Sequence, residues 1–167
     1  MVHGENMLGT LSLIIGKVCS GKTTFAKGLA QDHNAVVLSC DELLLTLHSF
    51  SNNFDFDAEI GQAKKYLWEL TIKLLNIGTN VILDWGFWDV KERDAINSFL
   101  SENGFPHEWH YMKPDDDLWQ ERICSRNSNT SSTEFFIDSG LLDKCNEKFN
   151  TPSIAELNEK EVIIHDQ

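Results

Sequence analysis

The amino-acid sequence predicts a single α/β domain with a mainly parallel β-sheet. Short apolar runs alternate along the chain with longer amphipathic segments, which is the pattern of strands connected by helices. The first apolar run stops at a glycine and is followed at once by a helical pattern. With 167 residues, 41% hydrophobic and 24% charged, the chain suits one domain over residues 1–167. Right-handed crossovers then make successive strands parallel.

The strands are expected where short, β-rich apolar runs occur. Residues 10–16, TLSLIIG, form such a run and stop at glycine, which predicts a buried strand. Residues 35–38 and 80–84 have the same apolar character. Residues 107–112 alternate between polar and apolar side chains, and residues 162–165 supply a last short strand.

The helices are expected in the intervals between these strands. Residues 23–33, 58–77 and 90–103 place apolar side chains at helical spacing, and the last two segments are each followed by a glycine. Pro114 and the three aspartates after it predict a helix start, because proline suits the first turn and carboxylates favour the positive end of the helix dipole. We expect this helix to end near Arg126. Further helices are expected at residues 43–47 and before Phe149, and loops at residues 49–57 and 127–133.

The composition favours a small-molecule partner over nucleic acid. The formal net charge is -12 and no basic stripe is present, so the protein would repel polyanions. The four cysteines form no C-x-x-C pair, and the sequence has neither a signal-like segment nor an apolar run of about 20 residues. We therefore expect a reduced, cytoplasmic protein with no membrane-spanning segment.

A phosphate-binding loop is predicted between the first strand and the helix after it. Residues 16–23, GKVCSGKT, match G-x-x-x-x-G-K-[ST] without a mismatch, and a chance match in a chain of this length is well under about one in a hundred. In such a loop the backbone N–H groups and the helix N-terminus surround the phosphates. The lysine reaches the β- and γ-phosphates, and the hydroxyl of the last residue binds Mg²⁺.

The nucleotide-binding residues follow from this motif. No N-K-x-D element is present to hold guanine, so ATP with Mg²⁺ is the expected ligand. Lys22 is expected to act on the transferred phosphate, and Thr23 to bind the metal. The expected nucleotide contacts are Gly16, Lys17, Val18, Cys19, Ser20, Gly21, Lys22, Thr23 and Thr24.

Two carboxylates are expected at the same edge of the sheet, because ligands of open parallel sheets bind beyond the carboxyl ends of the strands. Asp41 would close the second strand and accept a proton from an attacking hydroxyl, or cap the helix at residues 43–47, and the two roles are compatible. Asp84 ends the third strand, as does the acid that holds Mg²⁺ through water in related sites. The aromatic residues 85–88, WGFW, would wall an acceptor pocket or belong to the core.

Two arginines are expected in a lid. Arg122 and Arg126 are four residues apart on the predicted helix and so share one face, next to the polar loop at residues 127–133. A lid at about residues 115–135 would bring their charges to the phosphates, where they would stabilise the transition state. The alternative is surface pairing with acids such as Glu121.

The chain resembles P-loop kinase-like ATP-binding proteins, often called AAA family ATPases, which are relatives of zeta toxin, chloramphenicol phosphotransferase and polynucleotide kinase. The resemblance covers nearly the whole chain. It implies a P-loop NTPase three-layer sandwich with five strands in the order 2-3-1-4-5, lid arginines at Arg122 and Arg126, and an acceptor base at Asp41. Lys17-Val18-Cys19 departs from the small residues and proline common in these relatives. The matching segments are the phosphate loop, residues 38–42, 81–88, 92–94, 119–122 and 126–127.

These residues predict an ATP-dependent phosphotransferase that moves the γ-phosphoryl group to a hydroxyl of a small molecule. An alternative is a nucleotide-binding switch or slow NTPase without a metabolite acceptor, whose partner surface would include Phe135, Phe136 and Phe149. A polynucleotide kinase is less favoured because of the negative charge. A ring-forming domain does not fit in the chain, so a monomer or homodimer is expected.

Overall fold

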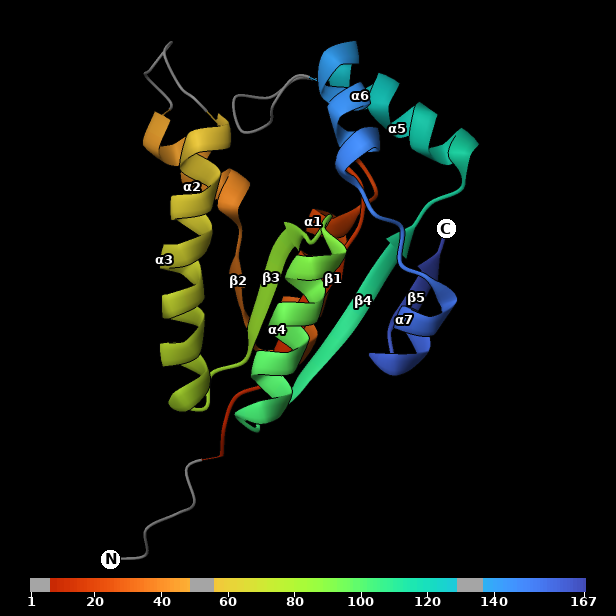
Figure 1. Cartoon of the computed structure of the whole chain (residues 1–167). Helices are drawn as coiled ribbons and strands as arrows, with labels where there is room; N and C mark the ends of the chain where they lie inside the picture. The colour runs from red at the N-terminus through yellow and green to blue at the C-terminus, as the bar shows by residue number, and fades with distance from the viewer. Residues whose placement is uncertain (1–6, 49–55, 129–136) are drawn as a thin grey trace, which may run out of the picture.

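The computed structural model describes residues 7–48, 56–128 and 137–167. Within them a five-stranded, all-parallel sheet has the order β2-β3-β1-β4-β5, which confirms the predicted fold class (Figure 1). The strands are β1 (Leu11–Ile15), β2 (Val36–Leu38), β3 (Val81–Gly86), β4 (His107–Lys113) and β5 (Ile163–Asp166). The helices are α1 (Lys22–His33), α2 (Cys40–His48), α3 (Phe56–Asn76), α4 (Val90–Glu102), α5 (Asp116–Ser128), α6 (Ser139–Lys148) and α7 (Ile154–Glu159).

The sheet is the middle layer of three, because its central strand buries both faces. In β1, Ile14 packs with Ala26 of α1 on one face. Leu13 and its neighbours on the other face pack with Leu75 of α3 and Leu100 of α4. Side chains of adjacent strand residues point to opposite faces, so the fully buried and mostly apolar strand β1 serves both layers.

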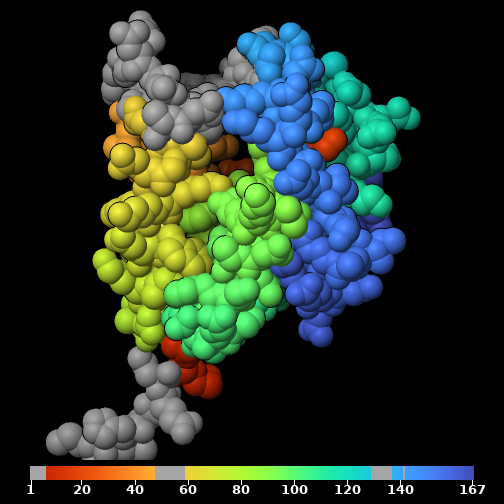
Figure 2. Space-filling view, viewed as in Figure 1, coloured from red at the N-terminus to blue at the C-terminus, as the bar shows by residue number. Residues whose placement is uncertain are grey.

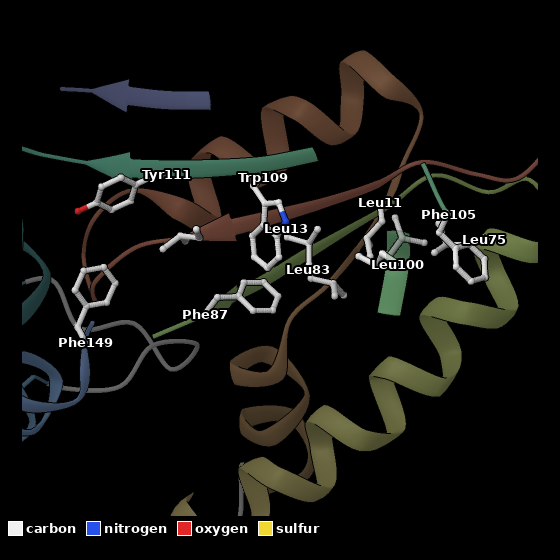
Figure 3. Packing of buried hydrophobic residues seen from close by; sticks show 12 residues of the cluster. Leu11, Leu13, Leu75, Leu83, Phe87, Leu100, Phe105, Trp109, Tyr111 and Phe149 are labelled. Atoms are coloured by element: carbon white, nitrogen blue, oxygen red, sulfur yellow. The ribbon is translucent and has the colours of Figure 1, made fainter. Parts of the chain in front are cut away.

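Aromatic residues fill the larger of the two layers. Trp109 of β4 is fully buried and meets the ring of Phe87 edge to face, with ring centroids 5.3 Å apart (Figure 3). A large aromatic side chain buries about 150–250 Å², so at about 25 cal/mol per Å² the burial of Trp109 contributes roughly 4–6 kcal/mol. The core therefore lies directly beneath the segment that follows β3.

The element boundaries differ from the prediction at three places near the site. Helix α2 begins at Cys40 and the Ser39 side chain accepts the N–H of Glu42, so serine takes the capping position and Asp41 lies in the first helical turn. Strand β3 continues past Asp84 to Gly86, and α5 continues to Ser128. The predicted loop at residues 49–57 lies mostly outside the described residues.

Helix α7 is absent from the prediction. It is capped by Ser153, whose hydroxyl accepts the N–H of Glu156, and it is only six residues long. Its first residue, Ile154, is 80% exposed, so the segment lacks the apolar stripe that indicates a helix in sequence. The helix lies between α6 and β5.

Candidate functional site

A large cleft opens beyond the carboxyl ends of β1 and β3. Its volume is about 1640 Å³, and it is lined by the segment from Val18 to Thr24, by α2 and α3, by residues 84–92, and by α5 and α6. Figure 2 shows this hollow between the α2–α3 side of the molecule and α6. Pockets for one small ligand measure about 300–1,000 Å³, so the cleft has room for two.

The loop between β1 and α1 has the backbone of a phosphate-binding loop. Gly21 has a left-handed backbone (φ 89°) at the start of α1, and Cys19 has φ 59°. A Cβ atom on Gly16 would overlap the hydroxyl of Ser20 and lie 3.2 Å from the carbonyl oxygen of Met112, so glycine permits the close packing here. The loop therefore leads directly into the N-terminus of α1, where unpaired N–H groups attract anions.

The carbonyl groups of this loop are bonded to side chains outside it. The indole N–H of Trp88 donates to the carbonyl of Gly16 (3.1 Å), and that of Trp119 donates to the carbonyl of Val18 (2.7 Å). Arg122 Nη1 donates to the carbonyl of Ser20 (3.2 Å). The sequence analysis did not anticipate the two tryptophan contacts, because hydrogen bonds to a distant backbone leave no local pattern.

Lys22 lies deep in the cleft between acidic side chains. Its Nζ donates to the carbonyl of Lys17 (2.6 Å). Burial lowers the pKa of Lys22, and the carboxylates of Asp84 and Asp41 oppose this effect. An anionic phosphate at this position would give the ammonium group a charged partner in place of the carbonyl.

Thr23 and Asp84 are brought together as predicted for a magnesium site. The hydroxyl of Thr23 donates to Asp84 Oδ2 (2.7 Å), and Asp84 is 7% exposed at the end of β3. Among the described residues, no group of three or more His, Cys, Asp or Glu could hold a metal ion by itself. Mg²⁺ is usually bound by one or two carboxylates together with substrate phosphates and water, so these two residues fit that ion.

Asp41 faces the same cleft from the first turn of α2. The carboxylate is accessible from the open cleft, but the surrounding protein still raises its pKa through burial. Lys22 opposes this rise, and Asp84 adds to it. The prediction that Asp41 closes β2 is wrong, because the strand ends at Leu38 and Ser39 caps the helix. The predicted meeting of Asp41, Lys22 and Asp84 in one cleft is present.

The two predicted lid arginines approach the phosphate loop from α5. Arg126 Nη1 lies 3.8 Å from the sulfur of Cys19, and Arg122 contacts Ser20 as described above. Both arginines line the cleft. The remainder of the predicted lid, residues 129–135, lies outside the described residues.

Not all loop residues turn towards the cleft. Val18, Cys19, Gly21, Lys22, Thr23 and Thr24 line it, whereas Gly16 and Ser20 are buried. The ammonium group of Lys17 lies 4.7 Å from the ring centre of Trp119 and 3.4 Å from Asn146 Oδ1. Its side chain is therefore directed away from the cleft.

The wall opposite the phosphate loop carries an ion pair that the sequence analysis missed. Lys64 of α3 lies 2.6 Å from Glu92 of α4, and its ammonium group is 5.8 Å from the ring of Trp85. The aromatic segment at residues 85–88 was expected either to wall an acceptor pocket or to belong to the core, and its members differ in this respect. Trp85 and Trp88 line the cleft, whereas Phe87 is fully buried in the core.

A buried ion pair contacts the backbone of residues 87 and 88, which follow β3. Arg93 of α4 is fully buried, and its Nη2 donates to Glu156 Oε2 of α7 (2.8 Å) while Nε donates to Oε1. Its Nη1 donates to the carbonyl of Phe87 (2.8 Å) and contacts that of Trp88 (3.3 Å). The ion pair therefore connects α7 with the segment after β3.

The strand order and the loop between β1 and α1 define a P-loop NTPase fold of the kinase type. A family profile described as an AAA domain matches residues 11–152, and the chain belongs to this family. None of the curated proteins matches the sequence significantly. No helix among the described residues is long and apolar enough to cross a membrane.

Solved structures of kinases share the fold at low sequence identity. A sugar kinase from a Janibacter species is 14% identical, with 95% of this chain and 85% of that chain covered and a TM-score of 0.63. A gluconokinase from Sinorhizobium meliloti is 17% identical, with 97% and 84% covered and a TM-score of 0.61. An APS kinase from Mycobacterium tuberculosis, in complex with AMPPNP and APS, is 13% identical, with 95% and 88% covered and a TM-score of 0.65.

Proposed function

We propose that the protein is an ATP-dependent phosphotransferase that moves the γ-phosphoryl group to a hydroxyl of a small molecule. The observation that carries this proposal is the placement of Asp41 beside Lys22 in a cleft with room for two ligands. A protein that only binds nucleotide needs no carboxylate on the acceptor side of the phosphates. A kinase needs one to receive the proton of the attacking hydroxyl.

Six residues of the cleft would have a role in this reaction. The acceptor oxygen attacks the γ-phosphorus, its proton passes to Asp41, and the bond to the oxygen shared with the β-phosphate breaks to release ADP. Lys22, Arg122 and Arg126 would balance the charge on the phosphate oxygens. Thr23 and Asp84 would hold Mg²⁺, which when bound neutralises charge on the β- and γ-phosphates.

The alternative, a nucleotide-dependent switch, gains no specific support from the described residues. The partner surface expected for it included Phe149, but this side chain is only 7% exposed and its ring lies 6.4 Å from that of Tyr111. Phe135 and Phe136 lie outside the described residues. A polynucleotide acceptor remains disfavoured because the net charge of the chain is -12.

The test is transfer of labelled phosphate from γ-labelled ATP to a panel of hydroxyl compounds. Sugars, gluconate and APS belong in the panel because they are named for the structural neighbours, and nucleosides and an oligonucleotide complete it. We expect transfer to a small molecule. Removal of a general base typically costs about 10²–10⁴ in rate, so we expect Asp41→Asn to lose about this much. Lys22→Ala should be inactive, whereas Lys113→Ala, which changes an exposed lysine, should be unaffected.

Two outcomes would contradict the proposal. Full turnover by Asp41→Asn would show that Asp41 is not the general base. Nucleotide-dependent capture of a partner protein, with no transfer to any compound of the panel, would favour the switch.

A further inference from the structure

Side chains from two separate elements hold the carbonyl groups of the phosphate loop from outside. Trp88, in the segment after β3, donates to Gly16, and Trp119, in α5, donates to Val18. Trp119 is 7% exposed, so its hydrogen bond at 2.7 Å is shielded from water. A hydrogen bond in such surroundings is costly to leave unmade.

These contacts determine which way the peptide N–H groups of the loop point. The peptide unit is planar and trans, so its C=O and the following N–H point in opposite directions. A donor that holds the carbonyl of Gly16 therefore orients the N–H of Lys17 away from Trp88. In the same way, Trp119 orients the N–H of Cys19 away from itself. Successive N–H groups that point away from such donors form the concave anion site of a phosphate loop.

The loop needs this support because its conformation is not locally preferred. Cys19 has a left-handed backbone (φ 59°), which costs a residue other than glycine roughly 1–2 kcal/mol. The loop contains no proline that would restrict its backbone. Contacts from outside the loop must therefore stabilise its backbone conformation when no phosphate is bound.

The segment around Trp88 is itself fixed. Gly16 donates its N–H to the carbonyl of Gly86 (3.0 Å), so both polar backbone groups of Gly16 are bonded to residues 86–88. A side chain on Gly86 would approach the Trp88 indole nitrogen to 2.7 Å, so this contact also depends on glycine. The carbonyl groups of Phe87 and Trp88 are held by the buried Arg93.

We propose that Trp88 and Trp119 are positioning residues that orient the phosphate loop for nucleotide binding. The proposal rests on the proposed function, because it assumes that the loop binds the phosphates of a nucleotide. Neither indole is required to touch the ligand. Each acts through the carbonyl group that it holds.

The test compares Trp88→Phe and Trp119→Phe with Trp68→Phe. Trp68 of α3 is a matched control because it is a tryptophan partly buried against the core, with its ring 5.7 Å from that of Phe99, and it does not line the cleft. Dissociation constants for ATP, ADP and AMP are measured by calorimetry, together with the melting temperature of each variant. We expect the constants for ATP and ADP to rise about fivefold to tenfold in Trp88→Phe and in Trp119→Phe, the effect of one lost hydrogen bond. Trp68→Phe should bind ATP as the wild type does.

AMP separates positioning from a general loss of structure. The loop is expected to hold the β- and γ-phosphates, so affinity for AMP should change little in either variant. An equal loss of affinity for AMP would indicate a merely structural role and overturn the proposal. Wild-type affinity for ATP in both variants would overturn it as well.

The binding measurements distinguish a failure of the proposed function from a failure of this inference. If the wild-type protein binds no ATP, both are wrong. If it binds ATP and Lys22→Ala does not, but Trp88→Phe and Trp119→Phe match Trp68→Phe, only the positioning role is wrong. Hydrogen exchange of the wild-type protein without nucleotide needs no variant: protection of the amide of Gly16, which donates to the carbonyl of Gly86, is expected relative to an unstructured peptide, and unprotected exchange would contradict a fixed loop.

Discussion

The ion pair between Arg93 and Glu156 makes a sharp prediction about stability. The Arg93 side chain is 0% exposed and that of Glu156 is 7% exposed, and two guanidinium nitrogens face the two carboxylate oxygens. Replacing Glu156 with Gln keeps the size of the side chain but removes its charge. The buried guanidinium group then lacks its counter-charge, and one of its donors faces an amide NH₂ group.

The expected loss follows from the burial of the pair. Removing one partner of a buried ion pair costs about 3–5 kcal/mol. Lys160 lies 3.7 Å from Glu156 Oε1 with its side chain 2% exposed, so a second cation also loses a nearby negative charge. For a domain of 150–250 residues, 1 kcal/mol corresponds to about 2–4 °C in Tm, so Glu156→Gln should lower Tm by about 6–20 °C.

Urea unfolding and thermal melting of matched variants measure this loss. Asp166→Asn is the control, because it breaks a pair with Lys113 in which the side chains are 75% and 58% exposed and which contributes at most about 1 kcal/mol. The double variant Arg93→Met with Glu156→Leu should recover much of the lost stability, since apolar side chains pay no penalty for lost charge partners. The reasoning is refuted if Glu156→Gln loses no more stability than Asp166→Asn.

Two further predictions concern the cleft. Thr23→Ala should weaken binding of ATP much more in the presence of Mg²⁺ than in the presence of EDTA, because the hydroxyl beside Asp84 would act only through the metal. Calorimetry under both conditions measures this difference. Equal weakening with Mg²⁺ and with EDTA would argue against a role of Thr23 in metal binding. Asp41→Asn should melt at a higher temperature than the wild type at pH 7. Burial raises the pKa of Asp41, so the folded protein binds this proton more tightly than the unfolded chain, and wild-type stability falls as pH rises from the ordinary carboxyl value of 3.8 through the raised pKa. The two melting temperatures should converge below that range, and a wild type that is more stable at pH 7 would contradict the assigned environment.

The sheet was predictable because its signals are local. The run of apolar residues in β1 and the motif from Gly16 to Thr23 lie next to each other in sequence, and their physics requires a buried strand, a turn and a helix start. Helix α7 was not predictable, because Ile154 is exposed and its buried residue is the charged Glu156. A charged residue becomes a core residue only when its partner, Arg93, is known.

The site was predictable only in part for the same reason. Lys22 and Thr23 open α1 just after β1, and Asp84 lies near the end of β3, the neighbour of β1 in the sheet, so their meeting follows from topology. Asp41 was misplaced in its element because Ser39 competes for the helix cap. The contact of Lys64 with Glu92 depends on how α3 packs beside α4, which no sequence spacing specifies.

The position of β1 in the middle of the sheet has a consequence for biosynthesis. Its neighbours β3 and β4 both follow it by long stretches of chain, so β1 leaves the ribosome with two unpaired edges and a mostly apolar sequence. The phosphate loop is made early as well, but Gly86, Trp88 and Trp119, which fix its backbone, are made much later. We therefore expect nucleotide to bind the nascent chain more weakly until α5 has been made, and β1 to lack both sheet neighbours until β4 has been made.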